Sequence, residues 1–195
     1  MPHKLKSTAR KSRRNKKIAA IGIMAAIVVI IGVVFAFGQL NAPKPVTVLL
    51  QTSMGNITLQ LRTDKPITTS NFINLVKQGA YDNTTFHRVI AGFMIQGGQV
   101  NRTVNPINDE IGTNNHNVNG TIAMAKTSAP NSATSQFFIN VIDNSNRYPE
   151  FDTTYTVFGN VIAGMNVAED ISKVATDSND KPIMDVVLIK AEILP

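Results

Sequence analysis

The chain has 195 residues, a formal net charge of +6, three histidines and no cysteine. This length accommodates one well-cored domain and a short additional segment, but not two domains of ordinary size. The absence of cysteine excludes a disulfide framework, a thiolate nucleophile and a cysteine-ligated metal.

The positive charge is concentrated in an N-terminal leader, residues 1–17. Eight of the 19 basic residues precede residue 18, and none of the 13 acidic residues lies before Asp64. The other 11 basic and 13 acidic residues leave the rest of the chain slightly acidic. Nucleic-acid-binding domains need a basic surface, so we expect no nucleic acid among the partners of the domain. A leader that itself binds nucleic acid or anionic lipid stays as an alternative, although basic clusters beside an apolar span normally set membrane topology.

Residues 18–38 predict a transmembrane helix. They form an uncharged, mostly apolar run, and a helix of this length spans the hydrocarbon core of about 30 Å. The cationic leader before the run predicts a cytoplasmic N-terminus and an extracytoplasmic C-terminal domain. Two alternatives stay open: a buried core helix, and a cleaved signal peptide that would release a secreted domain, since Ala36-Phe37-Gly38 resembles a cleavage site. The two prolines that follow favour an extended linker over residues 39–45.

The remainder, residues 46–195, predicts a mainly β domain. Short runs rich in β-branched and aromatic residues alternate with Gly, Pro and Asn clusters. Two stretches, Thr69–Gln78 and Met165–Val174, have helical spacing. The pattern fits a closed eight-stranded antiparallel barrel capped by two helices. The predicted strands are Val46–Thr52, Ile57–Arg62, Phe86–Ile90, Phe93–Ile95, Thr121–Ala125, Phe137–Ile142, Thr156–Phe158 and Val186–Ile193.

Several familiar chemistries have no counterpart in the sequence. The chain has no GxSxG, HExxH or P-loop motif. His3 belongs to the leader, and nothing in the spacing of His87 and His116 indicates a catalytic triad or a metal site. We interpret His87 as structural, because on a strand it points away from the face of its neighbour Arg88. The long Asn-rich segment Asn101–Asn119 predicts an irregular loop that borders a functional site.

Arg88 stands out as a charged residue within an otherwise apolar strand. One interpretation is an edge-strand arginine at the surface. The other is a binding arginine beside an apolar pocket that takes a small apolar group with a neighbouring carbonyl. Because Phe and Met in strands are usually core residues, the pattern alone leaves both open. The residues that would form the pocket are Phe93, Met94, Phe137 and Phe138, with the amides of Gln96 and Gln136 beside them.

The segment FHRVIAGFMIQGG, Phe86–Gly98, resembles the signature of the cyclophilins. Thr121–Ala125, Ser135–Val141 and Thr156–Val167 follow in the family's order, so the resemblance covers essentially Val46–Leu194. It is nearest to the bacterial-type members. The resemblance implies a peptidyl-prolyl cis/trans isomerase with an eight-stranded barrel and two helices. It also implies an enzyme that needs no cofactor, no metal and no covalent intermediate.

The resemblance assigns roles by motif position. Arg88 corresponds to the catalytic arginine. Tyr155 stands where many eukaryotic members have a histidine, and Phe151 stands at a leucine position in a segment that lacks the family's usual tryptophan. The positions that correspond to substrate-binding residues are Phe93, Met94 and Phe138 for the proline pocket, Gln96 and Gln136 for the amides, Ala125 for backbone contacts, and Phe151 and Tyr155.

The sequence therefore predicts a monomeric, membrane-tethered isomerase that acts on Xaa-Pro bonds of folding or exported polypeptides. The alternative is a proline-peptide-binding or chaperone module that keeps the pocket without turnover. The intact set of pocket residues around Arg88 favours the enzyme.

Overall fold

The computed structural model describes residue 30 and residues 44–195. The leader, the linker up to residue 43 and, apart from Ile30, the predicted transmembrane segment 18–38 lie outside the described residues. Among the residues that are described, no helix is both long and apolar enough to cross a membrane. Residues Lys44–Pro195 form one compact unit, which contains every strand described below.

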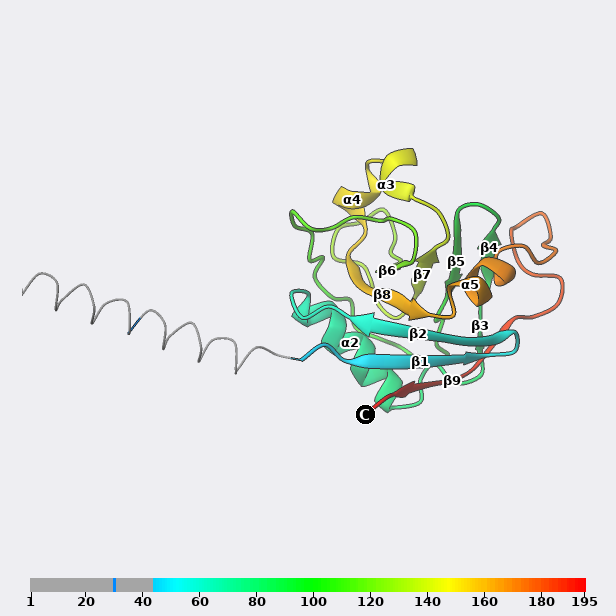
Figure 1. Cartoon of the computed structure of the whole chain (residues 1–195), viewed down its shortest axis with the longest axis horizontal. Helices are drawn as coiled ribbons and strands as arrows, with labels where there is room; N and C mark the ends of the chain where they lie inside the picture. The colour runs from blue at the N-terminus through cyan, green and yellow to red at the C-terminus, as the bar shows by residue number, and fades with distance from the viewer. Residues whose placement is uncertain (1–29, 31–43) are drawn as a thin grey trace, which may run out of the picture. The chain divides into compact units, whose positions relative to one another are not determined.

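This unit is built on one nine-stranded antiparallel sheet with the order β3-β9-β1-β2-β8-β6-β7-β5-β4 (Figure 1). The first and last strands of that order, β3 (Thr84–Thr85) and β4 (Arg88–Ile90), are separated along the chain by only Phe86 and His87. Two residues cannot cross a flat nine-stranded sheet, so the sheet curls until its edges approach each other. The other strands are β1 (Thr47–Thr52), β2 (Gly55–Leu61), β5 (Met94–Gly97), β6 (Thr121–Met124), β7 (Phe137–Asn140), β8 (Val157–Ala163) and β9 (Val187–Ile193).

The predicted antiparallel, mainly β fold is confirmed, but the predicted eight-stranded closed barrel is wrong in two respects. The predicted strand Phe86–Ile90 is shortened to β4, and an unpredicted strand, β3, precedes it. β3 pairs with β9, whereas β4 pairs with β5. The chain therefore changes its neighbour at Phe86 and His87, and the short piece before this corner counts as a ninth strand. Within residues 44–195, no ladder joins β3 to β4, so the closure comes from the continuous chain rather than from strand pairing.

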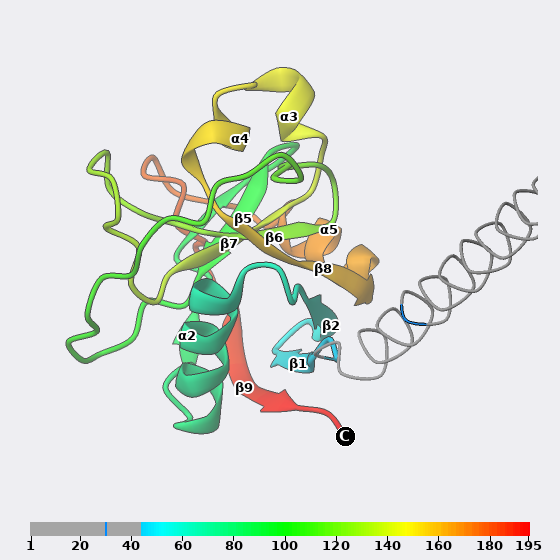
Figure 2. The ribbon, with the colours of Figure 1, turned by 90° about the vertical axis from the view of Figure 1, so that its left-hand side faces the viewer.

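Four helices accompany the sheet in residues 44–195, where two were predicted. Both predicted helices exist, as α2 (Pro66–Lys77) and α5 (Met165–Ile171). The two unpredicted helices, α3 (Asn144–Arg147) and α4 (Phe151–Thr154), have four residues each. A single turn shows no helical periodicity in the sequence. Figures 1 and 2 show α3 and α4 together at the end of the domain away from α2 and β9.

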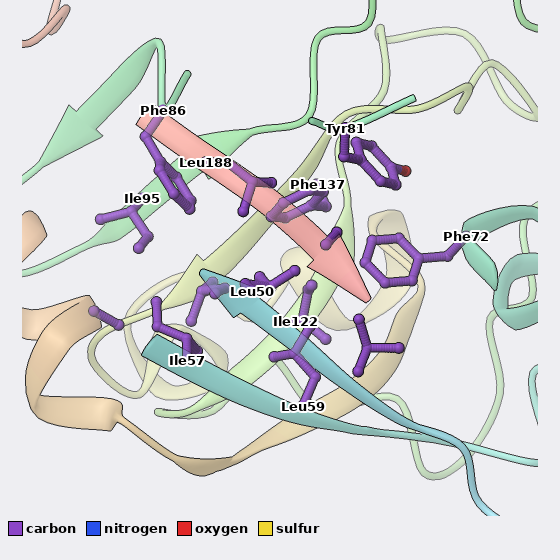
Figure 3. Close-up of a cluster of buried hydrophobic side chains, with 14 of the residues drawn as sticks. Leu50, Ile57, Leu59, Phe72, Tyr81, Phe86, Ile95, Ile122, Phe137 and Leu188 are labelled. Carbon is purple, nitrogen blue, oxygen red and sulfur yellow. The ribbon is translucent and has the colours of Figure 1, made fainter. Parts of the chain in front are cut away.

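The inner face of the curled sheet holds the main hydrophobic core. Buried residues alternate along β1, where Val48 and Leu50 point inward. Phe72 of α2 enters the same core, with its ring 5.1 Å from that of Tyr81 and 5.6 Å from that of Phe137 (Figure 3). Packing in this core therefore holds α2 against the sheet.

A carboxylate distant in sequence caps the N-terminus of α2. The helix begins at Pro66, and Lys65 before it makes no side-chain capping bond. Instead, the Glu110 carboxylate accepts hydrogen bonds from the backbone N–H groups of Ile67 (3.1 Å) and Thr68 (2.8 Å). Lys65 Nζ in turn donates to the Glu110 carbonyl. These bonds satisfy helix donors that have no intrahelical partner and tie the long loop Asn101–Asn119 to α2.

We predict that Glu110→Ala lowers the free energy of unfolding by about 1–2 kcal/mol, the usual effect of losing an N-terminal cap. Urea denaturation of residues 44–195 measures the loss. Glu110→Gln retains one acceptor oxygen and should lose less. The matched control is Glu150→Ala, which removes an exposed glutamate and should change the free energy by less than about 0.5 kcal/mol. Equal effects of Glu110→Ala and Glu150→Ala would contradict the capping role.

Candidate active site

Strand register brings residues that are distant in sequence into one row. Arg88 of β4 pairs with Gln96 of β5, and Gln96 pairs with Phe138 of β7. Phe138 pairs with Ala123 of β6, which pairs with Val157 of β8. Directly paired residues of an antiparallel sheet point to the same face. The five side chains therefore lie in a row across the outer face of the sheet.

This outer face carries a second apolar cluster, separate from the inner core. Its buried members are Met94, Ala123, Phe138 and Val157. Partly buried apolar residues around them, among them Phe151, leave a pocket of about 310 Å³. This volume lies at the lower end of the range for small-ligand sites. The pocket is lined by Arg88, Phe93, Met94, Gln96, Ala125, Lys126, Phe138, Phe151 and Tyr155.

Nearly all of the predicted site residues thus meet at one pocket; the prediction for Phe137 needs correction, and Gln136 lies beside the pocket. Phe137 does not face the pocket, because successive residues of a strand alternate in direction and Phe137 is fully buried in the inner core. Gln136 does not line this pocket either. Its side chain lies outside the pocket wall, and its Oε1 accepts a hydrogen bond from Gln96 Nε2 at 2.9 Å. With Gln96, Ala125 and Lys126 it lines a smaller neighbouring pocket of about 180 Å³.

Lys126 lines both pockets and was missed as a site residue in the sequence. Its side chain is only 6% exposed and lies 3.3 Å from the Asp109 carboxylate. Its ammonium group also donates to the Ala129 carbonyl at 3.0 Å. The one available signal was its position directly after Ala125, at the end of a predicted strand.

The aromatic wall of the pocket consists of edge-to-face rings around Phe151. The ring of Phe151 lies 4.8 Å from Tyr155, 5.6 Å from Phe93 and 6.2 Å from Phe138, measured between centroids. Such pairs contribute about 0.5–1.5 kcal/mol each beyond area burial. Phe151 therefore fixes the other rings relative to one another.

Two buried asparagines from the predicted irregular loop hold this wall in place. Asn115 Nδ2 donates to the carbonyls of Asp152 and Tyr155, both at 2.8 Å. Asn117 Nδ2 donates to the Phe151 carbonyl at 3.0 Å. The loop thus borders the site as predicted, by binding the backbone of α4. These asparagines were missed, because an Asn-rich loop does not indicate which carbonyls its amides will meet.

Arg88 stands at the rim of the pocket on an edge strand, with its side chain 44% exposed. Both interpretations of this residue therefore hold together, since it is a surface arginine and a pocket residue. Its Nε lies 3.4 Å from Oδ2 of Asp180. His87 lines a different pocket together with Asp82 and Gln99, so it faces away from Arg88. Burial lowers the pKa of His87.

His116 does have a carboxylate partner, contrary to expectation, but the arrangement is not a catalytic triad. His116 Nδ1 lies 2.9 Å from Oδ2 of Asp152, while Ser145 Oγ donates to Oδ1 of the same carboxylate at 2.7 Å. The carboxylate therefore lies between the hydroxyl and the imidazole. In a triad the imidazole contacts the hydroxyl and removes its proton, which this order prevents.

The fold and the pocket together define a class of protein: a curled antiparallel sheet with an arginine beside an apolar pocket on its outer face. The crystal structure of a cyclophilin type peptidyl-prolyl cis-trans isomerase from Cryptosporidium parvum shares this fold, with a TM-score of 0.71 at 28% identity over 77% of this chain and 98% of that one. The same protein in the presence of the dipeptide Ala-Pro gives a TM-score of 0.69 at 28% identity, over 76% and 99% of the two chains.

The sequence comparisons identify the family. The family model of cyclophilin type peptidyl-prolyl cis-trans isomerases matches residues 47–193. Peptidyl-prolyl cis-trans isomerase A of Dickeya dadantii is 41% identical over 184 residues, which are 88% of this chain and 97% of the relative. Peptidyl-prolyl cis-trans isomerase B of Escherichia coli is 42% identical over 158 residues, 72% and 95% of the two chains. The chain belongs to the cyclophilin-type peptidyl-prolyl cis-trans isomerase family, and it is an enzyme.

The free energy of unfolding should change with pH in the acid range, because the Asp152 carboxylate holds the aromatic wall. Burial alone would raise the pKa of Asp152, but hydrogen bonds from the Asn117 backbone, His116, Ser145 and the Asn117 amide outweigh it, and the pKa is lowered. A lowered pKa in the folded state means that the carboxylate stabilises the fold above its unfolded pKa of about 4. This stabilisation is lost as the pH falls through the folded pKa.

We therefore predict that the free energy of unfolding decreases below about pH 4 and that Asp152→Asn makes this decrease shallower while lowering stability at pH 7. Urea denaturation between about pH 7 and pH 2.5 measures both effects. Asp143→Asn is the control, because asparagine caps the N-terminus of α3 as well as aspartate does. An unchanged pH dependence in Asp152→Asn would show that this carboxylate does not contribute.

Proposed function

We propose that Arg88 catalyses rotation about Xaa-Pro peptide bonds by stabilising the twisted transition state. The observation that carries this proposal is the position of Arg88 at the rim of an apolar pocket lined by Phe93, Met94 and Phe138. Rotation of a peptide bond is opposed by about 18–20 kcal/mol, because the C–N bond has partial double-bond character. A catalyst must therefore weaken that conjugation rather than transfer a proton.

The geometry supports separate roles for the pocket and the arginine. The apolar pocket holds the proline ring, while Gln96 and Gln136 hold the neighbouring backbone through their amides. The guanidinium of Arg88 donates hydrogen bonds toward the proline nitrogen as it becomes pyramidal, or holds the proline carbonyl. Either contact is stronger in the twisted state than in the planar cis or trans state, and only such differential binding accelerates the reaction.

We propose that the substrates are folding or exported polypeptides. Both isomers of an Xaa-Pro bond are populated, since their free energies differ by only about 0.5–1 kcal/mol, and their slow exchange limits folding. The Ala-Pro dipeptide present with the Cryptosporidium parvum relative supports a proline-containing ligand.

We predict that Arg88→Ala lowers kcat/KM for an Xaa-Pro test peptide by about 100-fold or more, the usual effect of removing a donor that acts in the transition state. The assay uses residues 44–195, which contain all nine strands and the core. Arg88→Lys keeps the charge but not the planar fork of donors, so it should recover only part of the rate.

Urea denaturation should show nearly equal stability of wild type and Arg88→Ala, because the arginine lies at the exposed rim of the pocket rather than in the core. Full activity in Arg88→Ala would refute the role of the arginine. A folded wild-type domain that binds proline peptides without accelerating isomerisation would favour the alternative, a non-catalytic proline-peptide-binding or chaperone module.

We also propose that residues 18–38 anchor the enzyme in a membrane, with residues 1–17 in the cytoplasm and the catalytic domain outside it. The apolar run and its cationic leader support this arrangement. The family match begins only at residue 47, so this N-terminal segment is additional to the isomerase domain. A cleaved signal peptide is the second candidate, and it would give a secreted enzyme.

We predict that residues 1–45 fused to a reporter active only outside the cytoplasm give a positive signal in the membrane fraction. Replacement of the eight basic leader residues by glutamine should weaken or invert the orientation, because these charges set the topology. A signal only in the soluble extracellular fraction would indicate cleavage. A reporter that is active only in the cytoplasm would refute export.

A further inference from the structure

We infer that Asp180 is a positioning residue that orients the Arg88 guanidinium for catalysis. The inference rests on the proposed role of Arg88. Asp180 lies in the segment between α5 and β9, 92 residues from Arg88 in the sequence. Its Oδ2 is 3.4 Å from Arg88 Nε, and in the described part of the chain this is the only hydrogen bond that the Arg88 side chain makes.

The backbone fixes the place of Asp180 beside β4. The N–H of Val89, the residue after Arg88, donates to the Asp180 carbonyl at 2.8 Å. The contact between the Arg88 and Asp180 side chains therefore does not depend on these two side chains alone. A backbone bond one residue away holds the carboxylate near the arginine.

A different aspartate builds the turn that carries Asp180. Asp177 Oδ1 accepts from the N–H groups of Asn179 (2.8 Å) and Lys181 (3.0 Å), and the Asp177 N–H donates to the Lys181 carbonyl at 2.8 Å. The Asp180 carboxylate takes no part in these bonds, so it is available to Arg88. Asp180 itself has φ of +63°, in the left-handed region that glycine and asparagine adopt readily.

The contact limits the motion of an arginine side chain that is exposed to solvent. The Arg88 side chain is 44% exposed and has several freely rotating bonds, so its guanidinium would otherwise sample many orientations. A guanidinium is planar, and a carboxylate that accepts from Nε fixes the direction of that plane. The two terminal nitrogens then keep their N–H groups for the substrate. Because the ion pair is exposed, its effect is expected to be modest and sensitive to salt.

The test compares Asp180→Gly and Asp180→Asn in residues 44–195, with an uncharged Xaa-Pro peptide as substrate. Both replacements tolerate the left-handed backbone, so neither should unfold the turn. We expect Asp180→Gly to lower kcat by about two- to fivefold with little change in KM, as for loss of an exposed ion pair that acts in the transition state. Asp180→Asn keeps an acceptor oxygen without the charge and should lose less. Added salt should slow the wild type toward the rate of Asp180→Gly and leave the variant nearly unchanged.

Two controls distinguish a loss of Arg88 positioning from a general disturbance of the segment that contains Asp180. Asp185→Asn removes a negative charge from the same segment, where Asp185 lies 3.9 Å from Lys181 rather than near Arg88, and it should keep wild-type kcat. In the Arg88→Ala background, Asp180→Gly should cause no further loss, because a positioning residue acts only through the group that it positions.

Wild-type or higher kcat in Asp180→Gly would overturn the inference, and a higher value would mean that the carboxylate competes with the substrate for Arg88. An additional loss in the Arg88→Ala background would equally overturn it, since Asp180 would then act independently. Failure of the proposed function is distinguishable from both outcomes. In that case Arg88→Ala itself would leave the rate unchanged.

Discussion

The register of the β4-β5-β7-β6 part of the sheet is the constraint on which the site depends. On the inner face, Ile95 of β5 pairs with Ile139 of β7, which pairs with Ile122 of β6, and all three are fully buried. A slip of one residue would turn these isoleucines outward. The same slip would turn Gln96 and Phe138 inward and break up the row that ends at Arg88. The packing of the core thus aligns the pocket on the opposite face.

The corner at Phe86 and His87 sets the position of Arg88 in the sheet. There the chain leaves β9 and joins β5, so Arg88 becomes the first residue of an edge strand. Its backbone neighbour on the open side is the turn that contains Asp180, rather than another strand. The edge position thereby places the Asp180 carboxylate beside Arg88.

The sequence predicted those parts of the fold and site whose determinants are local. Runs rich in β-branched residues between turn clusters indicated β1, β2 and β9, and the segment Phe86–Gly98 indicated that Arg88 and Gln96 lie at one pocket. Alternation could not decide which of Phe137 and Phe138 faces the pocket, because both are buried and only the register of β7 separates them. The contacts of Asn115 with α4 and of Asp180 with β4 join segments far apart in the chain. Neither contact leaves a local pattern, so only the folded structure reveals it.

The two sides of the site are held by different forces. Neutral, buried amides of Asn115 and Asn117 hold the backbone of the aromatic wall. Hydrogen bonds between neutral buried groups do not weaken with salt. The arginine side depends on an exposed ion pair, which ions screen. Ionic strength therefore acts first on the orientation of Arg88, whereas acid pH acts on the aromatic wall through the Asp152 carboxylate. The two sides of the pocket thus respond to different solution conditions.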